Sequence, residues 1–332
     1  MLDRMGEFDL IKRYFTRPAR QAALGVGDDC ALLAPQPNTQ LAISSDMLVE
    51  GRHFFADVDP AALGHKALAV NLSDLAACGA KPLAFTLALA LPRVDEAWLA
   101  QFSRGLFALA DVHCCELVGG DTTQGPLNIC ITVFGEVPVV NGRSQALLRS
   151  GARAGDDIYV SGTLGDARLA LEAMRGKVTL PAEIFTQTRE RLERPTPRVA
   201  LGQALRGVAT AAIDVSDGLL GDLQHVLDAS HLGAVIDTSI AITLIASCSN
   251  YSGATGLFTL EKRLQYVLAG GDDYELAFTA PTAARAAVQA ASVLADTSVT
   301  RIGRMETNPG LRLIDADGRA VPHEFSSFDH FA

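Results

Sequence analysis

The stretch "DVDPAALGHKALAVNLSDLAACGAKP", residues 57–82, predicts one long helix that is apolar nearly all round. Asp59 can cap the start of this helix, Pro60 suits its first turn, and Gly79 followed by Pro82 ends it. A helix with apolar residues on every side is usually buried. We therefore expect it in the interior of a domain.

Predicted strands lie on both sides of this helix in the sequence. Residues 40–44 are expected to form a strand that ends at Asp46, and residues 84–92, nearly all apolar, a strand buried on both faces. Further elements expected in this half are an amphipathic helix at 95–114 and strands at 115–120 and 127–138. Such alternation is typical of an α/β or α+β domain.

A polar, glycine-rich stretch at residues 139–157 separates the two halves of the chain. We place a domain boundary there, which gives domains of residues 1–140 and 141–332. The second half again mixes strands and helices, with "RLERPTPR", residues 191–198, as a polar stretch. The other elements expected there are a strand at 157–162, a helix at 165–176, a strand, turn and helix at 209–233, a turn and strand at 268–281, a helix at 282–294 and two closing strands.

The composition limits the class of protein. Of 332 residues, 48% are hydrophobic and 20% charged, which fits a globular chain with a sizeable core. The formal net charge of -10 argues against non-specific binding to nucleic acid or to an anionic membrane. No segment approaches 18 uninterrupted apolar residues, and the first residues lack an apolar stretch of signal length. We expect a soluble, cytoplasmic protein.

The six cysteines do not form a metal-binding pattern, because none stands in C-x-x-C spacing. Most lie in apolar runs and are predicted to be small core residues in a reducing compartment. They are Cys30, Cys78, Cys114, Cys115, Cys130 and Cys248.

Aspartates recur where a strand-like run meets a bend that contains Gly, Ser or Thr. Each such acid taken alone is an ordinary turn or cap residue. Two adjacent carboxylates, however, repel each other by roughly 3 kcal/mol at an effective dielectric of about 20, unless a turn solvates them or a cation neutralises them. Carboxylate, hydroxyl and water are the ligands that Mg²⁺ prefers, so the set as a whole indicates several Mg²⁺ ions. The stretches are "GVGDD" (Asp28, Asp29), "AISSD" (Asp46), "VGGDTT" (Asp121), "AIDVSDG" (Asp214, Asp217) and "AGGDD" (Asp272, Asp273).

Asp74 differs because it lies inside the long apolar helix. It follows Asn71 by three residues, which places both on one helix face. A buried Asp needs a partner. Ser73 or Lys66 can supply one within the helix, and a metal ion or a ligand-bound cation is the alternative.

Several Mg²⁺ ions on aspartate oxygens suggest phosphate chemistry. The chain has no P-loop motif, no protein-kinase motifs and no pattern typical of a Ser-His-Asp or Cys-His nucleophile. "SGTLGDARL", residues 161–169, can either hold an anion at a helix N-terminus or form an ordinary turn and cap.

Nine stretches together carry a resemblance that spans nearly the whole chain. They are "GEFDLIKRYF", "GVGDDCALL", "AISSDMLVEGRHF", "KALAVNLSDLAACGAKP", "VGGDTT", "RSGARAGD", "AIDVSDGL", "GGDDYEL" and "FDHF". In this order they resemble the thiamine-monophosphate kinase family, within the ATP-dependent superfamily related to aminoimidazole ribonucleotide synthetase. The resemblance implies an N-terminal α/β domain that dimerises through its sheet and binds metal and ATP, and a C-terminal α/β domain that completes the nucleotide and substrate site.

The resemblance also implies a reaction and a set of site residues. ATP would phosphorylate thiamine monophosphate to thiamine diphosphate by direct in-line transfer, with Mg²⁺ and no catalytic residue beyond the metal-binding carboxylates. Positions that look like Mg²⁺ ligands are Asp29, Ser44, Ser45, Asp46, Asp74, Asp121, Asp214 and Asp217. Positions that look like nucleotide contacts are Gly120, Asp121, Arg149 and Ser216, and those that look like substrate contacts are His53, Asp272 and Phe328.

Three of these positions carry alternatives. The family commonly has Glu-Asp where this chain has Asp272-Asp273, so the carboxylate of Asp272 is drawn back by about one methylene. Phe328 suits stacking on a cationic thiazolium, or ordinary packing. Arg149 is either a nucleotide contact or a surface charge.

Other members of the superfamily are the nearest rivals. A selenophosphate synthetase would need a reactive Cys near its N-terminus, and a hydrogenase-maturation relative a C-terminal Cys. This chain ends in "FDHFA", and Cys30 lies in a core-like run. Aminoimidazole ribonucleotide synthetase and a non-catalytic nucleotide- and metal-binding protein remain alternatives.

Overall fold

The computed structural model describes residues 6–246, 258–322 and 325. These divide into two compact units. Unit 1 comprises the described residues of Met1–Leu75 and Ala80–Gln145, and unit 2 those of Ala76–Gly79 and Ala146–Ala332. Each unit is built around its own sheet, in agreement with the predicted two-domain α/β fold.

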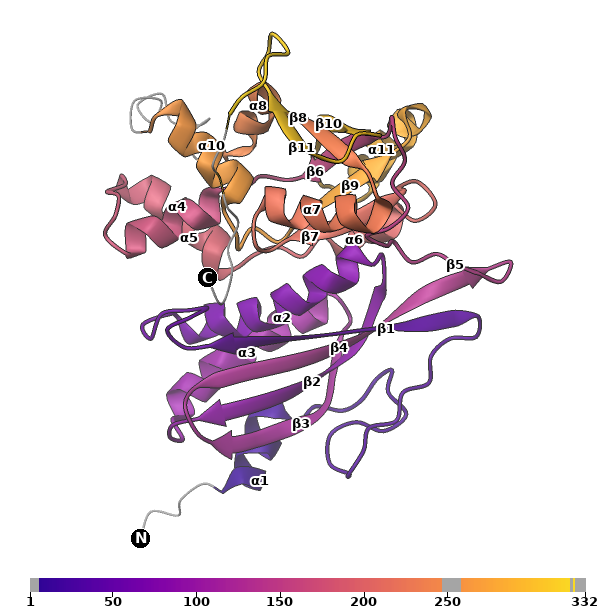
Figure 1. The fold of residues 1–332 in the computed structure, drawn as a ribbon. Helices are drawn as coiled ribbons and strands as arrows, with labels where there is room; N and C mark the ends of the chain where they lie inside the picture. Colours follow the sequence, from indigo (N-terminus) through magenta and orange to yellow (C-terminus); the bar gives the residue numbers. More distant parts are fainter. Residues whose placement is uncertain (1–5, 247–257, 323–324, 326–332) are drawn as a thin grey trace. The chain divides into compact units, whose positions relative to one another are not determined.

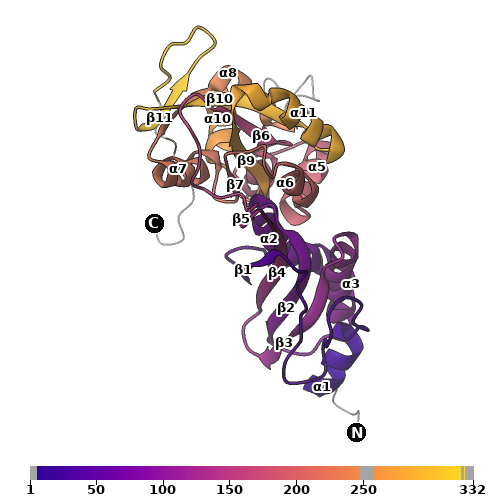
Figure 2. The ribbon, with the colours of Figure 1, turned by 90° about the vertical axis from the view of Figure 1, so that its right-hand side faces the viewer.

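Unit 1 is a five-stranded sheet with helices on one face (Figures 1 and 2). The strand order is β1-β4-β2-β3, with β5 beside β4, and only β2 and β3 run parallel. The helices α2 and α3 approach so closely that a Cβ added at Gly105 would lie 1.9 Å from the Ala61 carbonyl oxygen. The elements are α1 (Glu7–Leu10), a π-helix (Ile11–Phe15), β1 (Thr39–Val49), α2 (Pro60–Ala77), β2 (Lys81–Leu91), α3 (Glu96–Val112), β3 (Glu116–Gln124), β4 (Asn128–Val140) and β5 (Arg143–Ser144).

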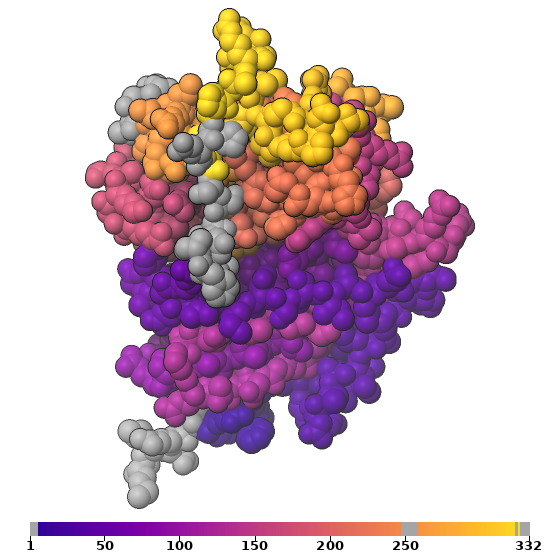
Figure 3. All heavy atoms as spheres, in the orientation of Figure 1, coloured from indigo at the N-terminus to yellow at the C-terminus, as the bar shows by residue number. Residues whose placement is uncertain are grey.

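The other face of this sheet exposes apolar side chains. Leu41, Ile43 and Met47 alternate along β1 and are 45%, 60% and 52% exposed. Figure 3, in the orientation of Figure 1, shows the strands of unit 1 at the molecular surface on this side. Exposed apolar patches of this kind mark interaction surfaces in soluble proteins.

Unit 2 is a six-stranded sheet of order β11-β8-β10-β6-β9-β7, in which only β11 and β8 are parallel. Its strands are β6 (Asp157–Ser161), β7 (Ala211–Val215), β8 (Gly233–Asp237), β9 (Glu275–Ala280), β10 (Val299–Glu306) and β11 (Gly310–Ile314). Its helices are α4 (Asp166–Met174), α5 (Ala182–Glu193), α6 (Val199–Ala204), α7 (Leu219–Ser230), α8 (Thr238–Ala241), α10 (Leu260–Ala269), α11 (Arg285–Leu294) and the 3₁₀ turns Ile242–Leu244 and Thr282–Ala284.

The long helix has the ends that the sequence predicts. The Asp59 carboxylate accepts a hydrogen bond from the Ala62 N–H at 2.8 Å, and Gly79 has a φ of 68°. Two strands, however, run further than expected. β1 continues to Val49 and β3 to Gln124, so Asp46 and Asp121 lie within strands and the predicted bends there are wrong. Continuous pairing with β4 and β2 keeps both segments extended.

Helix α5 covers residues 191–193 of the polar stretch at 191–198, and residues 194–198 connect α5 to α6. The burial of the cysteines also differs from expectation. Cys30 and Cys114 are exposed, and Cys115 is buried, which raises the pKa of its thiol. Cys248 lies outside the described residues.

In the described part of the chain, no helix is both long and apolar enough to span a bilayer.

Candidate active site

Two predicted metal positions meet where β1 packs on α2. The Ser44 hydroxyl donates a hydrogen bond to the Asp74 carboxylate. Two residues along the strand, the Asp46 N–H donates to Asn71 Oδ1 at 3.1 Å. Asn71 is held in turn by its Nδ2, which donates to the Ala67 carbonyl at 3.0 Å. Strand alternation and the three-residue helical spacing therefore gather two carboxylates, a hydroxyl and an amide.

Asp74 is half-buried, not buried as the all-apolar helix predicts. One partner, Ser44, comes from the neighbouring strand, which the sequence alone does not reveal. Ser45 points to the other face of β1, where its hydroxyl lies 3.0 Å from that of Thr132. Ser44 and Ser45 therefore do not present their hydroxyls to the same site.

A cavity of about 550 Å³ in unit 1 brings two further predicted positions together. Asp29, beside Asp28, and Asp121, beside Gly120, contribute to its wall. Asp29 and Asp121 are both exposed. Apolar side chains of β2, β3 and the N-terminal helices form other parts of the wall, among them Phe15, Leu87 and Val118.

Gly120 has a packing role in this wall. A Cβ at this position would lie 1.8 Å from the Leu87 carbonyl oxygen, and the φ of Gly120 is 148°. Only glycine allows β3 to approach β2 this closely. That Gly120 also contacts the nucleotide, as the family resemblance implies, stays a prediction.

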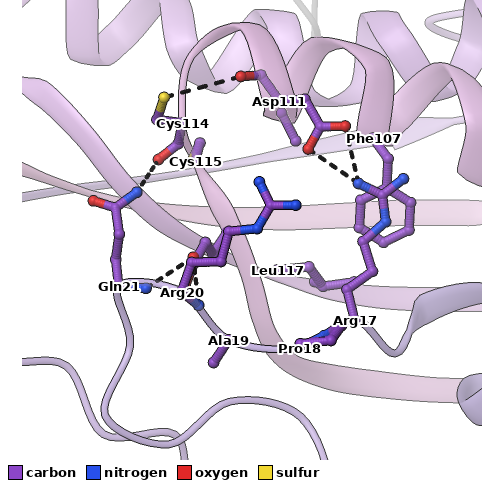
Figure 4. Close-up of a pocket in the computed structure, with 12 residues that line it drawn as sticks. Arg17, Pro18, Ala19, Arg20, Gln21, Phe107, Asp111, Cys114, Cys115 and Leu117 are labelled. Carbon is purple, nitrogen blue, oxygen red and sulfur yellow. Dashed lines mark hydrogen bonds and ion pairs between the residues drawn. The ribbon is translucent and has the colours of Figure 1, made fainter.

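A second cavity, of about 400 Å³, contains none of the predicted site residues (Figure 4). Beside it the Glu116 carboxylate accepts the N–H groups of Arg20, Gln21 and Ala22 at 2.8, 2.9 and 3.1 Å. The Arg17 guanidinium stacks 3.7 Å from the Phe107 ring centroid and also binds Asp111. These contacts anchor the segment that leads to Asp28 and Asp29.

In unit 2 the turn after β7 is organised by Asp222, a residue that the sequence reasoning missed. One oxygen of its carboxylate accepts the N–H groups of Ser216, Asp217 and Gly218 at 3.0, 3.1 and 3.1 Å. Burial, aided by the charge of Asp217, raises the pKa of Asp222 to about 7 although these three bonds oppose the shift. The feature of the sequence that could have indicated this role is the position of Asp222, an acid in the first turn of a helix.

The "GGDDYE" segment lies against this same turn. The N–H of Asp272 donates to the Ser216 carbonyl at 2.8 Å, and the N–H of Tyr274 donates to the Val215 carbonyl at 2.8 Å. Ser216 and Asp272, predicted separately as nucleotide and substrate contacts, are therefore neighbours in the fold. Asp214 is buried at the end of β7, and Asp217 is half-buried in the turn.

The N-terminus of α4 is already occupied by an acidic side chain of the protein itself. The Asp273 carboxylate, 1% exposed, accepts the N–H of Gly165 at 2.9 and 3.1 Å. Burial raises the pKa of Asp273 well above its usual range. Of the two interpretations of "SGTLGDARL", the structure favours a turn and cap.

The other predicted positions are His53, Arg149 and Phe328. His53 Nδ1 accepts the Val49 N–H at 2.9 Å. Arg149 is exposed, and its carbonyl accepts a hydrogen bond from Ser230. Phe328 lies outside the described residues. Within residues 6–246, 258–322 and 325, no three His, Cys, Asp or Glu side chains are grouped so that they could hold a metal ion.

Comparison with known proteins places this chain in a family. Family models for AIR synthase related proteins match the chain in two parts, the N-terminal domain over residues 27–137 and the C-terminal domain over residues 153–316. The thiamine-monophosphate kinase of Salmonella typhimurium is 45% identical over 333 residues, and that of Escherichia coli K12 46% over 332 residues. Both alignments cover 98% of this chain and 98% of the relative. The chain belongs to the thiamine-monophosphate kinase family.

Solved structures agree with membership of the thiamine-monophosphate kinase family. The enzyme from Stenotrophomonas maltophilia superposes with a TM-score of 0.80 and 45% identity, covering 91% of this chain and 92% of that one. "AaThiL complexed with AMPPCP and TMP" superposes with a TM-score of 0.75 and 29% identity, covering 90% and 89%. The hydrogenase maturation protein HypE, at 21% identity and a TM-score of 0.72, shares the fold.

Proposed function

We propose that this protein transfers the γ-phosphate of ATP to thiamine monophosphate, forming thiamine diphosphate and ADP. The observation that carries the proposal is 45–46% identity to thiamine-monophosphate kinases over 98% of both chains. The related structure with AMPPCP and TMP supports the pair of substrates.

Mg²⁺ suits the donor groups of unit 1. Mg²⁺ in phosphate-transferring enzymes is commonly held by one or two carboxylates together with water and substrate phosphates. The Ser44–Asp74 pair with Asp46, and the cavity wall with Asp29 and Asp121, each offer such oxygens. In unit 2, Asp214 and Asp217 are the corresponding candidates. When bound, Mg²⁺ supplies charge neutralisation for the phosphates.

The acceptor in this reaction needs little help from a protein base. A phosphate monoester is largely dianionic near pH 7, because its second pKa is about 6. The residues of this chain therefore have the tasks of binding and alignment. This fits an arrangement rich in carboxylates, in which the Ser44 hydroxyl donates to Asp74 and thereby orients it.

We assign the turn after β7 to nucleotide binding. Its three consecutive N–H groups already bind Asp222, so they are not available to a phosphate. The Ser216 hydroxyl is then the group of this turn that can bind a phosphate oxygen. Gly120, Asp121 and Arg149 are the other proposed nucleotide contacts, and His53, Asp272 and Phe328 the proposed thiamine contacts.

We also propose that the protein works as a homodimer in the cytoplasm. The exposed apolar side chains of Leu41, Ile43 and Met47 on one face of β1 support a contact between two copies through the sheet.

One assay tests the function. The protein is incubated with Mg²⁺, ATP and thiamine monophosphate, and thiamine diphosphate and ADP are quantified. Equal amounts of both products are expected, and none without thiamine monophosphate. ADP without thiamine diphosphate would indicate another reaction of the superfamily, such as that of aminoimidazole ribonucleotide synthetase. Nucleotide binding without turnover would indicate a non-catalytic protein.

A further inference from the structure

The segment that carries Asp272 has an unfavourable backbone conformation. Asp272 and Tyr274 have φ values of 66° and 52°, in the left-handed region that side chains rarely adopt. Two such residues on either side of Asp273 persist only where the surroundings hold them in place. The hydrogen bonds to Val215 and Ser216 fix one side of this segment.

A buried ion cluster fixes the other side. The Glu275 carboxylate is fully buried and lies between two guanidinium groups. Arg198 donates to it through Nε at 2.6 Å and Nη2 at 2.5 Å, and Arg191 through Nη2 at 2.8 Å. The Ser161 hydroxyl adds a bond at 2.6 Å. Glu275 also raises the pKa of Arg198, which outweighs the effect of burial on that group.

Arg191 connects this cluster to the strained segment itself. Its Nη2 also lies 3.4 Å from the Asp273 carbonyl and 3.2 Å from the Thr163 carbonyl. The Asp273 side chain binds the Gly165 N–H on the same side. The residue that follows Asp272 is therefore tied to the start of α4 and to α5, while the N–H of Asp272 itself is held by Ser216.

These arginines do not have the geometry of a phosphate site. Both are directed at Glu275, whose charge they neutralise inside the protein. The carboxylate also occupies the space beside Gly162, where an added Cβ would lie 2.2 Å from Glu275 Oε1. Their effect on a substrate must therefore pass through the segment that they hold.

We propose that Arg191, Arg198 and Glu275 are positioning residues that hold Asp272 in its left-handed conformation beside Ser216, so that its carboxylate meets the thiamine substrate. This rests on the proposed function for the identity of that substrate. The fixing of the segment by the cluster does not depend on it.

Arg198→Lys is the test variant. Lysine keeps the positive charge but cannot bind Glu275 through two parallel hydrogen bonds. We expect KM for thiamine monophosphate to rise at least about tenfold while KM for ATP changes less than about twofold. Hydrogen exchange of the peptide spanning residues 270–275, measured by mass spectrometry without substrate, should become faster.

Arg285→Lys is the matched control. Arg285 makes the same two-bond contact with a carboxylate in unit 2, to Asp157 at 2.6 and 2.9 Å. It should leave both KM values and the exchange of residues 270–275 unchanged. If Arg198→Lys does not fold, Arg191→Lys takes its place, because it leaves the Arg198–Glu275 bonds intact.

A double variant distinguishes the positioning of Asp272 from a general weakening of substrate binding. If Arg198 acts through Asp272, then Arg198→Lys should add little to the KM of Asp272→Asn for thiamine monophosphate. Additive losses, an equal rise of both KM values, or unchanged exchange at residues 270–275 would each overturn the proposal. Failure of the wild-type protein to phosphorylate thiamine monophosphate would overturn the proposed function and the substrate part of this proposal. The exchange measurement would still decide whether the cluster holds the segment.

Discussion

The hydroxyl of Ser44 donates a hydrogen bond to the carboxylate of Asp74, which lies 30 positions later in the chain. This bond joins an outer strand of the sheet to the helix that packs on it. It leaves the acid half-buried, beside a hydroxyl group that donates to it.

Asp74→Asn should separate metal binding from folding. We expect kcat to fall by about 100-fold or more, because the proposed Mg²⁺ site would lose a charged ligand. The free energy of unfolding should change by less than about 1 kcal/mol, because Asn retains an oxygen that accepts the Ser44 hydrogen bond. Turnover across an Mg²⁺ titration and urea unfolding measure the two effects.

Asp317→Asn provides the control for this variant, since Asp317 is an exposed acid that binds Arg319 outside the proposed site. It should retain full turnover. If Asp74→Asn instead unfolds readily and yet remains active at saturating Mg²⁺, then Asp74 is structural.

Asp272→Asn tests the proposed contact with thiamine. Asn tolerates the left-handed conformation as well as Asp does, so the backbone should be preserved. We expect KM for thiamine monophosphate to rise about tenfold, with KM for ATP unchanged. Equal effects on both substrates in steady-state kinetics would contradict the assignment.

The sequence predicted those features that depend on neighbouring residues. Asp59 and Gly79 end the long helix by local hydrogen bonding and backbone freedom, and both roles are confirmed. The ends of β1 and β3 depend on partners far along the chain. Asp46 pairs with Ile131 and Asp121 with Ala88, so pairing overrides the bends that Ser and Gly suggest.

The parts of the site that escaped prediction are those formed by distant contacts. Asp222 looks like an ordinary first-turn acid until the N–H groups of the preceding turn are seen to converge on it. Arg198 looks like part of a polar connection, yet it binds an acid 77 positions later. The charge pattern of a sequence does not show which oppositely charged residue a given side chain contacts in the fold.

Gly120→Ala tests whether this glycine is required by packing. A methyl group there would overlap the Leu87 carbonyl and force β3 away from β2. We expect a loss of about 2 kcal/mol or more in the free energy of unfolding, measured in urea. A matched Gly142→Ala variant, in a turn where an added Cβ meets no atom within 4 Å, should lose less. Wild-type stability with weakened ATP binding in Gly120→Ala would instead favour a purely nucleotide-binding role.

Ile43→Asp tests the proposed homodimer. The side chain is 60% exposed on the open face of the sheet, so the charge costs the single chain little but would be buried in a sheet-to-sheet contact. Sedimentation equilibrium should show a dimer for the wild type and a monomer for the variant. Val112→Asp, at a residue 74% exposed at the end of α3, should remain dimeric. A monomeric wild type would contradict the proposal.

Arg285→Gln tests the electrostatic contribution of an ion pair in unit 2 between an exposed arginine and a buried aspartate. The hydrogen bonds from Arg285 hold the pKa of Asp157 below its ordinary value of 3.8, against the effect of burial. A carboxyl whose pKa is lowered by folding stabilises the fold above its unfolded pKa, and this contribution is lost as the pH falls through the folded pKa. The wild type should therefore be more stable than the variant at pH 6–7, and the difference should shrink below about pH 4. Urea unfolding at several pH values measures it, with Arg319→Gln, from an exposed pair, as a control near zero throughout. A difference that stays constant down to pH 3 would show that Arg285 acts through the packing of its side-chain stem.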